Sequence, residues 1–278
     1  MSARRQIGSL ARRGLRASAI AYDRLAPPPP GAVILAYHQV GGPRPGAVNL
    51  TPAVFDDQLA VLAAGRRACP LVGLDDVVAR VQPGVEAEAA VSVTFDDGTA
   101  DFVDHALPLL VHHDIPVTLY LATAHVDAGR SFWDDGTVLS WAALRDACAT
   151  GIVTIGSHTH DHILLDRTDA DRVAADLDRS IGRIEDELGV RPTHFAYPKA
   201  LAPSPAVKPL VRERFASAAL AGGRPNRPGR TDLWGLDRTP VVAADTLADV
   251  VRKAAGGLRL EATARSAVDR VRYRGASR

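Results

Sequence analysis

The chain has 278 residues, with 33 Lys and Arg against 32 Asp and Glu, so its formal net charge is only +1. Without a global positive field, nucleic acid is not an expected partner. No apolar run reaches the roughly 18 residues of a membrane-spanning helix, and the start lacks the apolar core of a secretory signal. The two cysteines lack CxxC spacing, which argues against a disulfide framework. We expect a cytoplasmic protein with one large α/β domain.

Residues 1–30 are predicted to form a basic helix followed by a proline linker. At about 100° per residue, Ile7, Leu10 and Leu15 fall on one helix face and Arg12 and Arg16 on the other. The proline run at 27–30 ends the helix, so the main domain is placed at 31–278. Two interpretations remain open. The helix lies on the anionic inner face of a membrane as a peripheral contact, or it packs on the domain with its arginines in solvent.

From residue 33 onward, short β-rich runs alternate with helical patterns. Strands are predicted at 33–36, 90–95, 117–121, 152–155 and 194–196, and helices after Pro52, over 101–112, after Ser140 and from Thr168. Alternation of this kind indicates parallel βα units. Near-continuous apolar strands joined by crossovers are typical of a (β/α) barrel, regular or not.

Two adjacent carboxylates, Asp96 and Asp97, end the predicted strand at 90–95 and precede Gly98. In a parallel barrel the carboxyl ends of the strands face the reaction site. One carboxylate can bind a cation, which relieves the repulsion between like charges, while the other acts as a base. The alternative is a turn whose side chains cap the next helix, and for this tripeptide alone that alternative is favoured.

A histidine cluster follows the predicted strand at 152–155. His158 and His162 are four residues apart, so on a helical turn they share one face and can bind one metal ion together with a carboxylate. His160 lies between them and is expected to face elsewhere. The alternative is a polar loop of hydrogen-bonded imidazoles, but so dense a cluster favours the metal site.

Three motifs occur in order: Thr94-Phe-Asp-Asp-Gly98, Ser157-His-Thr-His-Asp-His162 and His194-Phe-Ala-Tyr-Pro198. Together they resemble the polysaccharide deacetylase family, the NodB-homology fold of carbohydrate esterase family four, over residues 33–242. The resemblance implies a single-domain distorted (β/α) barrel with a catalytic base at Asp96. It also implies one divalent ion, Zn²⁺ with Co²⁺ or Ni²⁺ as alternatives, held by Asp97, His158 and His162. By the same analogy, the backbone N–H of Tyr197 donates to the oxyanion.

The sequence departs from the usual pattern of that family in three places. The third motif lacks the arginine that orients the base, so the orientation must come from elsewhere. Lys199-Ala200 replaces an aromatic residue and a glycine after Pro198, and a Leu-x-His motif is missing near the C-terminus. That last motif normally supplies the general acid, and the corresponding region reads Leu233-Trp-Gly-Leu-Asp-Arg-Thr-Pro240.

The general acid is expected at His38 instead. Ala36-Tyr37-His38 resembles the tyrosine-histidine element of a rearranged subgroup that includes poly-N-acetylglucosamine deacetylases, whose acid histidine comes from the N-terminal side. Asp237 is a candidate for a carboxylate that favours the protonated imidazole. The alternative is a hydrogen-bonded histidine in the core.

The expected activity is the metal-dependent removal of N-acetyl groups from an amino-sugar glycan or a lipid-linked amino sugar. Two alternatives stay open: hydrolysis of a small non-sugar amide at the same metal site, and glycan binding without turnover. Trp133, Trp141 and Trp234 are candidates for stacking on sugar rings, although tryptophans more often serve the core.

Overall fold

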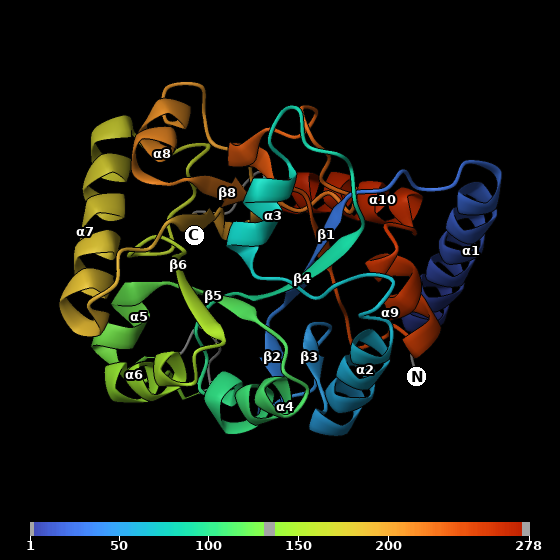
Figure 1. Ribbon diagram of the computed structural model, residues 1–278, viewed down its shortest axis with the longest axis horizontal. Helices are drawn as coiled ribbons and strands as arrows, with labels where there is room; N and C mark the ends of the chain where they lie inside the picture. The colour runs from blue at the N-terminus through green and yellow to red at the C-terminus, as the bar shows by residue number, and fades with distance from the viewer. Residues whose placement is uncertain (1–2, 131–136, 274–278) are drawn as a thin grey trace.

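The computed structural model describes residues 3–130 and 137–273, so Trp133 lies outside the described residues. Seven parallel strands form the main sheet in the order β8-β7-β6-β5-β4-β1-β9 (Figure 1). Their bounds are β1 Ala32–Tyr37, β4 Ala90–Phe95, β5 Val117–Leu121, β6 Val153–Ser157, β7 His194–Ala196, β8 Ser217–Ala219 and β9 Arg238–Pro240. A bridge between Ala219 and Leu236 links β8 to the segment before β9, so the sheet is a nearly closed barrel. The predicted fold class is confirmed.

All five predicted strands are present, and two more, β8 and β9, escaped the sequence pattern. They are only three residues long, Ser-Ala-Ala and Arg-Thr-Pro, and neither contains an apolar run. A separate pair of short strands, β2 (Gln39–Val40) and β3 (Asn49–Leu50), follows β1. Strand β9 pairs with β1 in parallel, which brings the last third of the chain beside the first strand.

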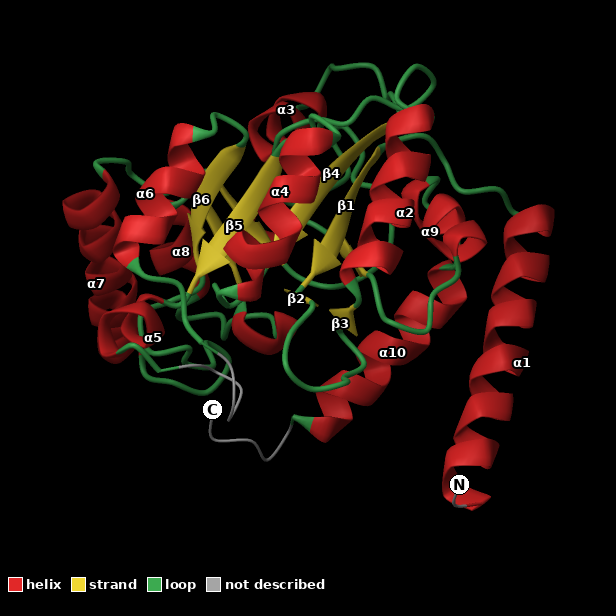
Figure 2. Ribbon diagram, turned by 90° about the horizontal axis from the view of Figure 1, so that it is seen from below, coloured by secondary structure: helices red, strands yellow, loops and turns green. Residues whose placement is uncertain are grey.

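Helices cover the outside of the barrel (Figure 2). Their bounds are α1 Ala3–Leu25, α2 Pro52–Ala64, α3 Leu74–Arg80, α4 Leu107–His112, α5 Thr123–Ala128, α6 Trp141–Ala149, α7 Ala170–Leu188, α8 Lys208–Arg214, α9 Leu247–Ala254 and α10 Arg259–Arg272. A π-helical turn, η1 (Phe102–Ala106), precedes α4, and two 3₁₀ turns are η2 (Pro198–Ala200) and η3 (Leu233–Gly235). Helix α7 begins where Asp169 accepts the N–H of Arg172 and ends at Gly189 in the left-handed region, as its sequence pattern predicts.

The two faces of the strands bury different side chains. On β4, Val91, Val93 and Phe95 pack outward into the apolar cluster that contains Phe55 and Leu59 of α2. The alternate residues Ser92 and Thr94 point to the other face, inside the barrel, and both are buried. Since Asp96 continues this second series, the alternation directs its carboxylate toward the barrel axis.

Helix α1 packs against α10 at one side of the molecule (Figures 1 and 2). Arg16 forms ion pairs of 2.7 to 2.8 Å with Asp245, Asp249 and Glu261, although the packing interpretation expected the arginines in solvent. Asp23 accepts hydrogen bonds from Leu258 and Arg259. For the part of α1 that contains Arg16 and Asp23, these contacts favour packing on the domain. They give no support to membrane contact. Among the described residues, no helix is both long and apolar enough to span a bilayer.

Candidate active site

The loop after β4 directs two neighbouring carboxylates to different partners. Asp96 donates its N–H to Tyr37 O, which holds the loop against the end of β1. Asp97 and Gly98 both have φ of +78°, a conformation that is unfavourable for a non-glycine residue such as Asp97. This reversal separates the two side chains: Asp96 contacts Arg238, and Asp97 lies beside the two histidines.

Arg238 at the start of β9 orients the carboxylate of Asp96. Two guanidinium nitrogens donate to the two carboxylate oxygens at 2.6 and 2.9 Å, and both side chains are buried. Burial alone would raise the pKa of Asp96, but the charge of Arg238 and its hydrogen bonds lower that pKa well below its usual range. Asp96 is therefore held as an ionised acceptor in one orientation.

Arg238 orients the base in place of the arginine that the third motif lacks. It lies in residues 233–240, the segment that was compared only with the absent Leu-x-His motif. The sequence offered only a weak indication of this role, because Arg238 is a single arginine in the short strand Arg-Thr-Pro. The role becomes recognisable once β9 is known to pair with β1, which lies beside β4. The Arg238 guanidinium also lies over the ring of the buried Tyr120, 5.2 Å from its centroid.

Asp97, His158 and His162 form a group suited to one metal ion. One ligand atom from each lies within 4.8 Å of the others, and all three residues are buried. The Nε2 atoms of His158 and His162 lie 3.7 and 4.0 Å from Asp97 Oδ1. Two imidazole nitrogens and one carboxylate oxygen are a donor set for a divalent transition ion, with further coordination positions left for water and substrate.

The surroundings of the two histidines fit this role. His158 donates from Nδ1 to the carbonyl of Ala196 at 2.7 Å, which leaves the lone pair of Nε2 directed at the site. Burial lowers the pKa of His158, and burial together with the neighbouring His158 lowers that of His162 well below its usual value. Neutral imidazoles are the form that binds metals.

The backbone between the two histidines has a different conformation from the one expected. Their four-residue spacing suggested a helical turn, but residues 158–162 form an irregular loop after β6. Thr159 and His162 have φ of +69° and +54°, so the loop reverses and returns His162 to the site. His160 points elsewhere as expected, with Nδ1 2.8 Å from Thr123 Oγ1.

Asp176 of α7 stabilises this loop and was missed in the sequence. Its carboxylate accepts the N–H groups of His160 and Asp161 at 2.8 and 2.9 Å. Its position on the apolar face of α7, where a buried polar side chain needs partners, was the available signal.

His38 follows β1 and its Nε2 lies 3.9 Å from Asp96 Oδ2. The segment after it is fixed by Asp101, whose carboxylate accepts the N–H of Val40 at 2.7 Å. The carboxylate that faces His38 is therefore Asp96. The expected partner Asp237 precedes β9, whose first residue pairs with Ile34, so it lies beside the beginning of β1 rather than its end. The pairing of His38 with Asp237 was wrong.

The expected role of Tyr197 also needs correction. Its backbone N–H donates to Ala219 O at 3.1 Å, in the ladder between β7 and β8. Its hydroxyl donates to Trp234 O at 3.0 Å, and the residue is fully buried. Since the N–H is already used within the barrel, it is not available to an oxyanion.

Trp141 and Trp234 have structural partners. Trp141 donates to Asp127 Oδ1 and lies under the guanidinium of Arg183. Trp234 donates to Phe215 O and lies under Arg212. These contacts favour the expectation that tryptophans serve packing here.

Comparison with known sequences gives one family match and one curated relative. Residues 84–212 match the family described as Polysaccharide deacetylase. The poly-β-1,6-N-acetyl-D-glucosamine N-deacetylase of Staphylococcus epidermidis is 28% identical over 113 residues, which cover 41% of this chain. The same segment spans 38% of that relative's length.

Solved structures share the barrel. IcaB from Ammonifex degensii superposes with a TM-score of 0.72 at 24% identity, over 82% of this chain and 98% of that one. The Streptococcus pyogenes deacetylase PplD, in complex with acetate, gives 0.70 at 18% identity, over 81% and 99%. The deacetylase domain of BpsB from Bordetella bronchiseptica gives 0.60 at 20% identity, over 77% and 98%. At these identities the similarity establishes the fold.

Proposed function

We propose that this chain, whose residues 84–212 match the polysaccharide deacetylase family, hydrolyses N-acetyl groups on an amino-sugar glycan with one bound divalent ion. One observation carries the proposal. The carboxylate of Asp96, fixed by Arg238, lies 3.9 Å from His38, and the adjacent residue Asp97 forms the candidate metal group with His158 and His162. Base, acid and metal ligands thus converge at the carboxyl ends of neighbouring strands.

Each residue has a separate task in this reaction. A bound divalent ion would polarise the acetamide carbonyl and acidify a water molecule. Asp96 accepts a proton as the water oxygen attacks the carbonyl carbon, and Arg238 keeps its carboxylate in the required orientation. His38 donates a proton to the sugar nitrogen as the C–N bond breaks. Acetate leaves and a free amine remains on the sugar.

The proposed substrate is an oligomer or polymer of β-1,6-linked N-acetylglucosamine. Support comes from the name of the Staphylococcus epidermidis relative, which is similar over 113 residues, and from the family match, which contains Asp96, Asp97 and the histidine motif. A lipid-linked amino sugar is the second substrate class, and it shares the same acetamide chemistry.

The test measures acetate release from β-1,6-linked N-acetylglucosamine oligomers, chitooligosaccharides and a lipid-linked N-acetyl sugar. The purified protein is assayed after chelation and after reloading with Zn²⁺, Co²⁺ or Ni²⁺, with Asp96→Asn as the inactive control. We expect metal-dependent acetate release from at least one glycan. A folded, metal-loaded protein that releases acetate from none of these substrates contradicts the proposal. Acetanilide is assayed beside them as a non-sugar amide, and its hydrolysis without release from any glycan contradicts the substrate class.

A further inference from the structure

The imidazole of His38 is placed by the backbone around it. Its Nε2 atom faces Asp96 Oδ2 at 3.9 Å, while its Nδ1 atom is buried and has no hydrogen-bond partner within residues 3–130 and 137–273. On one side, the preceding residue Tyr37 ends β1, and its carbonyl accepts the N–H of Asp96 at 3.2 Å. The position of the proposed acid therefore depends equally on what fixes the chain on its other side, at β2.

Strand β2 is held from two directions. The N–H groups of Gln39 and Gly41 donate to carbonyls of residues 48–50, at 3.2 and 2.7 Å, on the β3 side. Since alternate N–H groups of a strand point to opposite sides, the N–H of Val40 points away from β3. It donates to Asp101 Oδ2 at 2.7 Å. Val40 is fully buried, so its N–H needs an acceptor from the protein, and Asp101 supplies it.

The turn that follows Asp101 contacts the same strand. Gly41 has φ of +75°, and a Cβ added to it would lie 2.5 Å from His105 Cδ2, so the imidazole ring lies against the Gly41 Cα. His105 belongs to η1, the π-helical turn that begins one residue after Asp101. Asp101 and His105 thus contact Val40 and Gly41 from one short segment. This segment directly follows the loop of Asp96, so the chain that carries the proposed base also fixes the strand after the proposed acid.

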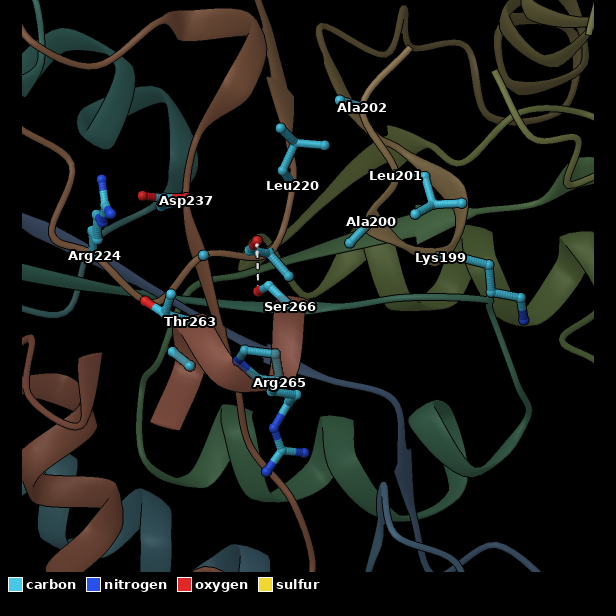
Figure 3. A pocket seen from close by; sticks show the side chains of 14 residues that line it. Lys199, Ala200, Leu201, Ala202, Leu220, Arg224, Asp237, Thr263, Arg265 and Ser266 are labelled. Carbon is cyan, nitrogen blue, oxygen red and sulfur yellow. Dashed lines mark hydrogen bonds between the residues drawn. The ribbon is translucent and has the colours of Figure 1, made fainter. Parts of the chain in front are cut away.

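Asp237, the carboxylate that was expected beside His38, lies in different surroundings. It stands in the wall of a cavity of about 310 Å³ beside α10, together with Leu220 and Arg224 (Figure 3). Of the described residues, those that line this cavity include neither His38 nor Asp101. The carboxylate that supports the chain after His38 is Asp101, and it acts through a backbone N–H instead of an ion pair with the imidazole.

We propose that Asp101 is a positioning residue for the general acid: by accepting the N–H of Val40 it fixes β2 and holds the His38 imidazole where it can donate to the leaving nitrogen. The inference rests on the proposed function and deepens it. Without the acceptor β2 can shift, and a displacement of about 1 Å can lower a rate on the order of 100-fold. The attack of water, which depends on Asp96 and the metal ligands, does not use this contact.

The test compares kcat for an N-acetyl glycan with kcat for p-nitrophenyl acetate, whose leaving group needs little help from an acid. Asp101→Ala removes the acceptor, while Asp101→Asn keeps an acceptor oxygen and removes only the charge. Asp104→Asn, an exposed position on η1, is the matched control. If Asp101→Ala does not fold, Asp101→Ser takes its place, because the shorter side chain moves the acceptor away from Val40 and leaves less space empty.

We expect Asp101→Ala to lower amide turnover by about 10- to 100-fold and ester turnover by less than about threefold, with unchanged metal content. Asp101→Asn and Asp104→Asn should stay within about threefold of the wild type on both substrates. Equal losses of amide and ester turnover in Asp101→Ala would overturn the proposal, because a general loss of structure lowers both. An Asp101→Asn variant as impaired as Asp101→Ala on the amide would overturn it as well.

A double-mutant cycle tests whether Asp101 acts through His38. In the His38→Gln background the acid is already absent, so adding Asp101→Ala should change amide turnover by less than about threefold. The same loss in both backgrounds would show that Asp101 acts by another route.

Crystal structures of the variants separate this inference from the proposed function. If no glycan releases acetate but the distance from His38 Nε2 to Asp96 Oδ2 increases in Asp101→Ala and not in Asp101→Asn, the hydrolase proposal fails and the positioning role stands. If acetate is released and Asp101→Ala changes neither amide turnover nor that distance, the hydrolase proposal stands and the positioning role fails.

Discussion

Arg238 donates to both carboxylate oxygens of Asp96, at 2.6 and 2.9 Å, across a separation of 142 residues in the chain. The arginine lies outside residues 84–212, the segment that matches the polysaccharide deacetylase family. The orientation of the proposed base therefore depends on β9, a three-residue strand that pairs with β1.

Replacing Arg238 should lower turnover without removing the metal. Arg238→Lys keeps a positive charge but loses the planar pair of donors, so we expect kcat to fall on the order of 10- to 100-fold while KM changes little. Arg238→Met leaves a buried carboxylate unpaired and should also destabilise the fold by about 3 kcal/mol or more. Steady-state kinetics, metal content and thermal melting distinguish these effects. A Lys variant with wild-type kcat would show that the paired hydrogen bonds are not needed.

Tyr120 should support Arg238 through its ring rather than its hydroxyl. The ring lies under the guanidinium, the hydroxyl has no partner among the described residues, and a Cβ on Gly156 would lie 2.5 Å from the ring. We expect Tyr120→Phe to retain nearly full kcat and Tyr120→Leu to lose roughly tenfold, in line with about 1 to 2 kcal/mol for a buried cation–π contact. Loss of activity in the Phe variant would assign the role to the hydroxyl instead.

The metal assignment separates two classes of variant. His158→Ala removes a ligand, so the purified protein should lose its ion and its activity together. Asp96→Asn should retain about one ion per chain and lose turnover by on the order of 100-fold or more, because only the base is changed. His112→Ala, on α4, serves as the control. Elemental analysis of the three proteins is the measurement, and an undiminished ion content in His158→Ala would contradict the site.

His38 is predicted to be the general acid. His38→Gln should lower kcat on an N-acetyl substrate by on the order of 10²- to 10⁴-fold with unchanged metal content. An acetate ester has a better leaving group and needs less help from an acid, so its hydrolysis should fall much less. If amide and ester turnover fall equally, His38 acts in binding or positioning and the proton comes from another group.

Arg16 should stabilise the protein in a pH-dependent way. Burial opposes ionisation of Glu261 and Asp249, but hydrogen bonds and charges, including those from Arg16, lower the pKa of both carboxyl groups. Groups with a lowered folded-state pKa contribute stability above their unfolded pKa of about 4 and lose it as pH falls further. We expect Arg16→Met to cost about 1 to 3 kcal/mol at pH 7, since the site is partly exposed. The difference from wild type should shrink below about pH 4, as denaturant unfolding at several pH values would reveal.

The sequence predicted the barrel and the main chemical groups because both leave local signals. Apolar runs marked five strands, and Asp96, Asp97, His158 and His162 each follow one of them. Strand ends are brought together by a parallel barrel whatever the details of the loops.

The features of the site that the sequence analysis missed or misassigned depend on strand register, on contacts between distant segments and on loop conformation. Arg238 was missed because β9 is too short to show a pattern, and Asp237 was wrongly paired with His38 because strand register is not visible in the sequence. Tyr197 was carried over by analogy, although its N–H belongs to the ladder with β8. The turn that joins His158 to His162 depends on two left-handed residues, which spacing alone does not reveal.

The position of Arg238 also sets an order of events during synthesis. His38, Asp96, Asp97, His158 and His162 all leave the ribosome before β9 is made. A nascent chain that ends before residue 238 contains every proposed metal ligand, the base and the acid. It lacks the arginine that orients the carboxylate of Asp96. Translation must therefore reach the last strand of the barrel before the protein becomes competent for the proposed reaction.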